Sequence, residues 1–143
     1  MTKEYDQYKK LIDSTIKLNL KCRALSKDKK EGLGKYNFAM EYATVKIDIG
    51  RQTGKTTYIN EKLEKDKSAI VIVNARQQHS NFKTNKERTI IINKFNSRDS
   101  FIIENLANIK TIYIDDASWN DKTELVYEIF TQDDIERTFV LLG

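Results

Sequence analysis

Five short apolar runs, separated by stretches with helical spacing, constrain the fold of this chain more than any other feature. The run SAIVIVNA at 68–75 is continuous and rich in β-branched residues, which is typical of a strand covered on both faces. The other runs are ATVKIDI at 43–49, RTIIINKF at 88–95, IKTIYIDDAS at 109–118 and ERTFVLLG at 136–143. Helical spacing occurs in TTYINEKLEKD at 56–66 and in DKTELVYEIFTQ at 121–132. This alternation predicts an α/β fold in three layers, with a mainly parallel sheet of about five strands between helices.

An amphipathic helix is predicted before the first strand, over residues 3–26. Its apolar positions, spaced three to four apart with some drift, are Tyr5, Tyr8, Ile12, Ile16, Cys22 and Leu25. Cys22 is the single cysteine, and we interpret it as a small buried apolar residue. The segment 26–37 contains Gly32 and Gly34 and is predicted to be a turn or connection.

Length and composition indicate one globular domain in the cytoplasm. The 143 residues suffice for a single core, and we divide them into a helical extension at 1–34 and a core at 36–143. No apolar run is long enough to span a membrane, so we expect a cytoplasmic protein, in the host cytoplasm if the chain is viral. The net charges of residues 1–36, 37–95 and 96–143 are +5, +5 and −6. This separation predicts either a basic face for nucleic acid or phosphates, or a solvated lysine-rich surface.

The segment GRQTGKTT at 50–57 follows a predicted strand and precedes a predicted helix. A phosphate-binding loop needs small residues where backbone N–H groups converge on an anion at a helix N-terminus, and Gly50 and Gly54 meet that need. Lys55 would reach the β and γ phosphates, and the Thr56 hydroxyl would bind Mg²⁺. We therefore expect ATP and Mg²⁺ as ligands, with a plain surface turn as the alternative.

Two adjacent carboxylates end the apolar run at 111–114. Asp115 lies at the C-terminal end of a predicted strand, where ligands bind in open parallel sheets, and is a candidate metal ligand together with Thr56. Asp116 follows it directly, and two buried adjacent carboxylates without a metal would be costly, which favours a functional pair. The alternative for Asp115 is a helix cap.

Three rather than four residues separate the glycines of this loop, and the segment resembles the variant phosphate loop of the large terminase subunits of tailed phages. The resemblance covers 36–143 and implies a RecA-like P-loop NTPase core, shortened and without the nuclease domain. It places these residues at the nucleotide: Gly50, Arg51, Gln52, Thr53, Gly54, Lys55, Thr56 and Thr57. It also implies that Arg51 is an arginine finger acting in cis, and that the catalytic groups are Arg51, Lys55 and Asp116. Terminases have glutamate at the position of Asp116, so the shorter side chain predicts slow or absent hydrolysis.

Weaker features of the resemblance concern three other regions. The loop with Arg76, Gln77, Gln78 and His79 corresponds to one near nucleic acid in such motors, and solvated loop residues are the alternative. Tyr36 and Phe38 are candidates for stacking on adenine, although we favour core packing for both. The last strand is expected between the strand of the loop and the strand of Asp115, with Gly143 where a sensor motif would begin.

These features predict a small Mg²⁺-dependent ATPase or ATP-binding protein, terminase-like and phage-encoded, that acts with DNA or with a protein of DNA packaging or replication. The alternative is a regulatory or binding module that engages a motor or nucleic acid without hydrolysis. A nucleotide kinase is a weaker alternative, because no arginine-rich lid follows Asp116. Arg137 and Arg98 are candidates for an arginine supplied to a neighbouring subunit.

Overall fold

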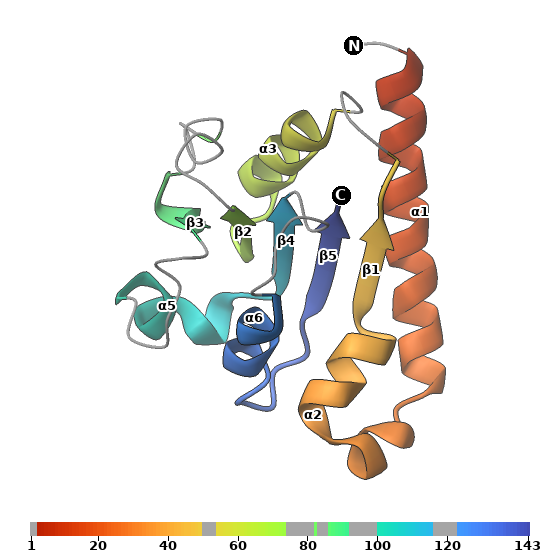
Figure 1. The fold of residues 1–143 in the computed structure, drawn as a ribbon, viewed down its shortest axis with the longest axis vertical. Coiled ribbons are helices and arrows are strands. Elements are labelled where there is room, and N and C mark those ends of the chain that lie inside the picture. Colours follow the sequence, from red (N-terminus) through yellow and green to blue (C-terminus); the bar gives the residue numbers. More distant parts are fainter. Residues whose placement is uncertain (1–2, 50–53, 74–81, 83–85, 92–99, 116–122) are drawn as a thin grey trace.

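The computed structural model describes residues 3–49, 54–73, 82, 86–91, 100–115 and 123–143. Its centre is one five-stranded sheet with the order β1-β5-β4-β2-β3 (Figure 1). All four strand pairs are parallel, so all the C-terminal strand ends lie along one rim. The last strand in the chain, β5, is an interior strand of the sheet, between β1 and β4.

The helices and strands follow one another in the alternating order predicted for an α/β fold. In chain order they are α1 (Lys3–Leu25), α2 (Lys29–Tyr42), β1 (Thr44–Ile47), α3 (Lys55–Lys65), β2 (Ala69–Val73), β3 (Thr89–Ile91), α5 (Ser100–Asn105), the 3₁₀ helix η3 (Leu106–Asn108), β4 (Thr111–Asp115), α6 (Thr123–Phe130) and β5 (Thr138–Leu142).

Two hydrophobic clusters lie on the two faces of the sheet. On one face, α1 and α3 cover alternate strand residues such as Val71 and Val140. On the other face, α2, α5 and α6 cover the intervening residues, such as Ile72 and Leu141. Because successive side chains of a strand point to opposite faces, strands buried on both sides must be apolar throughout, as β2 and β5 are. The prediction of an α/β fold with about five parallel strands is confirmed.

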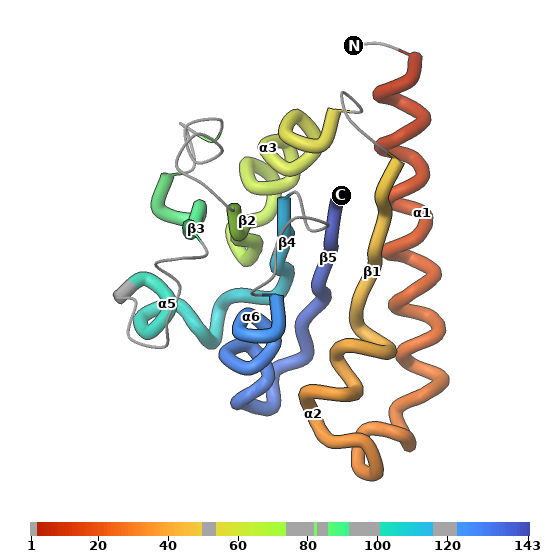
Figure 2. Tube along the Cα trace, in the orientation of Figure 1, coloured from red at the N-terminus to blue at the C-terminus, as the bar shows by residue number. Residues whose placement is uncertain are grey.

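The path of α1 runs the height of the molecule beside the edge strand β1 (Figure 2). The predicted N-terminal helix is thus confirmed, with Tyr5, Tyr8 and Ile12 buried against the sheet side. The prediction for its last turns was wrong, because Cys22 is exposed and Leu25 is 85% exposed.

Arg23 takes the buried position near the C-terminal end of α1. Its guanidinium donates to the backbone oxygen of Arg137 at 3.3 Å, to Asn19 Oδ1 at 2.9 Å and to Thr138 Oγ1 at 2.9 Å. A buried charge is tolerated when hydrogen bonds replace its water, and here the partners include residues more than a hundred positions away. Hydrophobic spacing alone therefore could not identify this position.

The segment 26–37 was predicted to be a connection, and that prediction was wrong, because α2 begins at Lys29. Gly34 has a non-helical φ of 81° and ψ of 162°, so α2 consists of two helical segments on either side of a kink at this residue. Beyond the kink, Phe38 and Ala39 are buried, and Phe38 stacks on Tyr42 with ring centroids 5.2 Å apart. Gly34 thus interrupts the helix as a glycine with positive φ does, whereas Gly32 lies within the first helical segment.

Candidate functional site

The head of α3 forms the described part of the predicted phosphate loop. Gly54 precedes the helix with a φ of 93° and a ψ of 21°, which is left-handed backbone that favours glycine. Its carbonyl accepts the first helical hydrogen bond, from the backbone N–H of Tyr58 at 2.9 Å. The unpaired N–H groups of a helix's first turn attract anions, so this end of α3 suits a phosphate group.

Lys55, Thr56 and Thr57 form the first turn of α3. Lys55 and Thr56 are half-buried, whereas Thr57 is exposed. The structure therefore places three of the predicted phosphate-binding residues together at one helix N-terminus, beside Gly54. Gly50, Arg51, Gln52 and Thr53 lie outside the described residues, and their roles stay predictions.

Asp115 is the last residue of β4 and is 3% exposed. It pairs in register with Leu142, which in turn pairs with Ile47 near the end of β1. Since neighbouring strands are about 4.8 Å apart, the Cα atoms of Asp115 and Ile47 are roughly 10 Å apart along the same rim. Helix α3 contacts β4 as well as β2. The carboxylate and the head of α3 therefore lie at the same edge of the sheet, with β5 between their strands as expected.

Oxygen ligands suited to Mg²⁺ are present at this rim. Thr56 and Asp115 offer a hydroxyl and a carboxylate, and Mg²⁺ is usually held by one or two carboxylates together with phosphate and water. Within the described ranges no group of three or more His, Cys, Asp and Glu residues gathers as a metal cage. Asp116 lies outside the described residues.

Tyr5 of α1 packs directly on Gly54, a contact that the sequence did not reveal. A Cβ atom on Gly54 would lie 2.8 Å from Tyr5 Cδ1, so only glycine fits under this ring. Burial and the neighbouring Glu61 carboxylate raise the pKa of the Tyr5 phenol far above its ordinary value. Glu61, on α3, also accepts from Lys9 Nζ of α1 at 3.2 Å. The N-terminal helix is therefore joined to the helix that follows the loop.

Further polar contacts between α1 and α3 lie toward the C-terminal end of α3. Tyr58 OH donates to Asp13 Oδ1 at 2.7 Å, and Lys62 Nζ pairs with the same oxygen at 3.0 Å. Burial, followed by the hydrogen bond to Asp13, raises the pKa of the Tyr58 phenol strongly. A pocket of about 340 Å³ opens here, at the end of the sheet opposite the candidate site, and is lined by Asp13, Ile16, Leu20, Tyr58, Lys62, Lys65, Asp66, Thr111, Tyr113 and Thr138.

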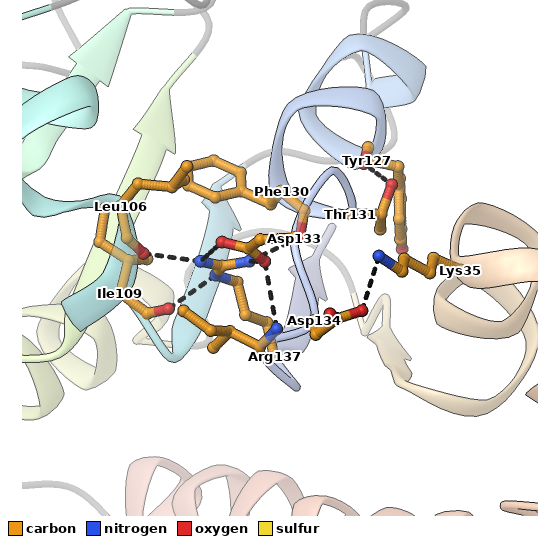
Figure 3. A network of polar contacts seen from close by, with 10 residues as sticks. Lys35, Leu106, Ile109, Tyr127, Phe130, Thr131, Asp133, Asp134 and Arg137 are labelled. Carbon is orange, nitrogen blue, oxygen red and sulfur yellow. Dashed lines mark hydrogen bonds and ion pairs between the residues drawn. The ribbon is translucent and has the colours of Figure 1, made fainter.

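Arg137 was a candidate arginine finger for a neighbouring subunit, and the structure contradicts this. Its side chain is 1% exposed and lies inside a network of polar contacts, which Figure 3 shows from close by. It donates to the backbone oxygens of Leu106, Ile109 and Phe130 and to the carboxylate of Asp133. A guanidinium held on all sides inside the protein cannot reach a neighbour. Arg98 lies outside the described residues.

Tyr36 and Phe38 are not placed at the candidate site. Both belong to α2, which precedes β1 and so lies at the N-terminal end of that strand, opposite the head of α3 (Figure 1). Phe38 is buried, and Tyr36 contacts Tyr127 edge to face with centroids 6.1 Å apart. Core packing is confirmed for Phe38, and Tyr36 packs against the core as a partly buried residue. The loop with Arg76, Gln77, Gln78 and His79 lies outside the described residues.

No helix in the described part of the chain has the length and apolar content of a membrane span. Comparison of the chain with protein-family models, curated proteins and solved structures found no match.

Proposed function

We propose that this chain is a Mg²⁺-dependent ATP-binding protein of the P-loop class, with a RecA-like, terminase-like core and slow ATP hydrolysis. One observation carries the proposal. A left-handed glycine at the head of α3 and the buried carboxylate of Asp115 lie on one rim of a parallel sheet, with a single strand between β1 and β4. Nucleotides bind at this rim in open α/β sheets, where helix N-termini meet phosphates.

Each residue of the site has a role in binding. The backbone N–H groups at the head of α3 donate to the phosphates, and Lys55 neutralises negative charge on the β and γ groups. Thr56 and Asp115 hold Mg²⁺, which screens the triphosphate. The loop residues 50–53 complete the cradle.

Hydrolysis needs two further groups. Asp116 accepts a hydrogen bond from the attacking water and orients it, and Arg51 neutralises charge on the phosphoryl group in transfer. Arginine fingers contribute about 10³ to 10⁵ in rate where they operate, so Arg51 largely decides whether turnover is measurable. Asp116 is one methylene shorter than glutamate, which places its oxygens farther from the water and favours slow turnover.

Calorimetry with Mg²⁺ and a non-hydrolysable ATP analogue tests the binding site. We expect the wild type to bind and Lys55→Ala to lose affinity by about 100-fold, because the charge on the β and γ phosphates is no longer neutralised. Lys65→Ala, at the last turn of the same helix, is the matched control and should bind like the wild type. Equal binding by Lys55→Ala and the wild type would refute the proposed site.

A non-hydrolysing regulatory module is the second candidate, and the aspartate at position 116 favours it. A phosphate-release assay with and without DNA separates the two functions. If the chain is an ATPase, Asp116→Asn should bind the analogue normally and release phosphate at least about 10 times more slowly. Binding of the analogue without phosphate release from the wild type would establish the regulatory module instead.

A further inference from the structure

A row of lysines follows the outer side of α1. Lys3, Lys10, Lys17 and Lys21 are separated by seven, seven and four residues, and all four are exposed. Each residue turns an α-helix by about 100°, so these spacings keep the four side chains on one side, with a drift of about 20° per seven residues. The row of these four residues, hereafter the lysine row, extends over roughly 27 Å at a rise of 1.5 Å per residue.

The lysine row points away from the rest of the protein. The buried residues of α1 include Tyr5, Tyr8 and Ile12, which lie roughly half a turn around the helix from the row. Helix α1 is also the outermost element beside the edge strand β1, as Figures 1 and 2 show. A large, straight ligand can therefore approach the whole length of the row.

The surroundings leave the positive charge of the row available. Among the described residues, none of its four ammonium groups lies within salt-bridge distance of a carboxylate. Two acids of α1 adjoin the row: Asp6 is exposed, three residues from Lys3 and four from Lys10, and Asp13 accepts from Tyr58 and pairs with Lys62. With four lysines against these two acids, one of which is already paired, the row keeps an excess of positive charge. Exposed acids such as Glu124 and Glu128 belong to α6, on the opposite face of the sheet. These acids therefore lie on the side of the sheet away from the lysine row.

We propose that the lysine row binds the phosphate backbone of double-stranded DNA. Four cations fixed along a straight helix can all be neutralised at once by a polyanion that is itself straight. Duplex DNA carries one negative charge per about 1.7 Å and is stiff over about 150 base pairs, so it meets that requirement without ordering a flexible strand.

An anionic membrane is a poorer match for the same charges. A helix that lies on a membrane buries its apolar face in the lipid and keeps its lysines above that face. In α1 the main apolar face is already buried in the protein. Leu11, Leu18 and Leu25 are exposed, but as three residues spaced seven apart they form a narrow line to the side of the lysine row.

Fluorescence anisotropy with a DNA duplex of about 20 base pairs tests this proposal, using the whole chain without nucleotide and salt from about 50 to 200 mM. With four phosphate contacts, log K should fall against log salt with a slope near −3.6 (about −0.9 per contact). In Lys10→Gln/Lys17→Gln the slope should be shallower by about 2, and the affinity at the lowest salt about 10-fold weaker.

Lys67→Gln/Lys110→Gln is the matched control, because both lysines are exposed and lie outside α1. It removes the same net charge and should leave the slope within about 0.5 of the wild type. Equal loss in both double variants would show that only net charge matters and would overturn the proposal. So would an absent salt dependence, or tighter binding to phosphatidylserine vesicles than to DNA.

The DNA test is independent of the nucleotide site. Lys55→Ala lies outside the lysine row and should bind the duplex like the wild type. Failure of ATP binding and failure of DNA binding are therefore distinguishable outcomes.

Discussion

Arg137 lies inside the protein with its guanidinium bonded to three backbone carbonyls and one carboxylate (Figure 3). One of the carbonyls belongs to Phe130, the last residue of α6, where a helix has no intrahelical donor left. Arg88 serves α3 in the same way, donating to the oxygens of Leu63 and Asp66. Two arginines that each lie just before a strand thus bind backbone oxygens at the C-terminal end of a helix.

Asp133 is the only carboxylate bonded to Arg137 among the described residues, and it predicts a loss of stability in acid. The hydrogen bond from Arg137 holds the pKa of Asp133 below its ordinary value. A lowered pKa in the folded state means that the pair stabilises the protein above about pH 4 and that this contribution is lost as pH falls through the folded pKa. Asp133→Asn should therefore reduce the free energy of unfolding by about 1 to 3 kcal/mol at pH 7, with a smaller difference from the wild type near pH 2.

Urea denaturation followed by circular dichroism between about pH 7 and 2 measures this effect. Asp134→Asn is the control, because its carboxylate is 93% exposed and pairs only with the exposed Lys35 among the described residues. Surface pairs contribute little, so this variant should unfold like the wild type at every pH. A pH-independent difference for Asp133→Asn would mean that the ionised carboxylate is not what stabilises the network.

At the scale of elements, α1 and α3 act as one unit beside the candidate phosphate site. Tyr8 and Tyr58 meet edge to face with centroids 6.5 Å apart, and Tyr58 contacts Tyr113 of β4 in the same way at 6.1 Å. The contact of Tyr5 with Gly54 lies at the end of this interface that faces the loop. The position of Gly54 is therefore set both by its own backbone and by a side chain from α1.

These two constraints on Gly54 can be measured separately. Alanine at this position must adopt a left-handed backbone, at about 1 to 2 kcal/mol, and its Cβ must also displace the Tyr5 ring. In a Tyr5→Ala background only the backbone cost remains. Gly54→Ala should therefore destabilise the wild type by at least about 1 kcal/mol more than it destabilises Tyr5→Ala.

A double-mutant cycle by urea denaturation gives both the backbone cost of alanine at position 54 and the cost of displacing the Tyr5 ring. Gly32→Ala is the control, because nothing lies within 4 Å of a Cβ there, and alanine should be neutral or stabilise α2 by up to about 1 kcal/mol. If Gly54→Ala lowers the free energy of unfolding equally in both backgrounds, the Tyr5 ring moves aside without a measurable cost.

At the scale of the whole molecule, β5 joins the two parts of the sheet. It pairs with β1 on one side and with β4 on the other, and all five of its residues are buried. Contacts between β1 and the strands of the other part pass through it. Phe139 of this strand also stacks on Tyr127 of α6 with centroids 4.3 Å apart.

Removal of residues 138–143 should therefore abolish cooperative unfolding, because β1 with α1 then loses its place on the sheet. Far-ultraviolet circular dichroism during thermal and urea denaturation tests this expectation. Removal of Gly143 alone is the control, since it takes away the bond from its N–H to the Ile47 oxygen at 2.8 Å, worth about 1 kcal/mol. If the chain without residues 138–143 still unfolds cooperatively, the remaining strands form a stable sheet without β5.

Sequence patterns predicted the helices and strands in which buried side chains recur at regular intervals within one short segment. The continuous run at 69–73 and the helical spacing after Lys55 each indicated an element that the structure contains, because residues close in sequence share one face there. The resemblance to terminases added the position of β5, and strand direction placed Asp115 at the rim of the candidate site.

The amino-acid sequence by itself thus determined the alternation of strands and helices, since periodicity follows from backbone geometry. Tertiary structure alone decided that α2 is a helix, that Arg23 is buried where Cys22 and Leu25 are not, and that Tyr5 covers Gly54. These outcomes depend on carbonyls and rings contributed by distant segments. A polar or aromatic side chain is buried where such partners replace its water, and no local pattern records where those partners come to lie.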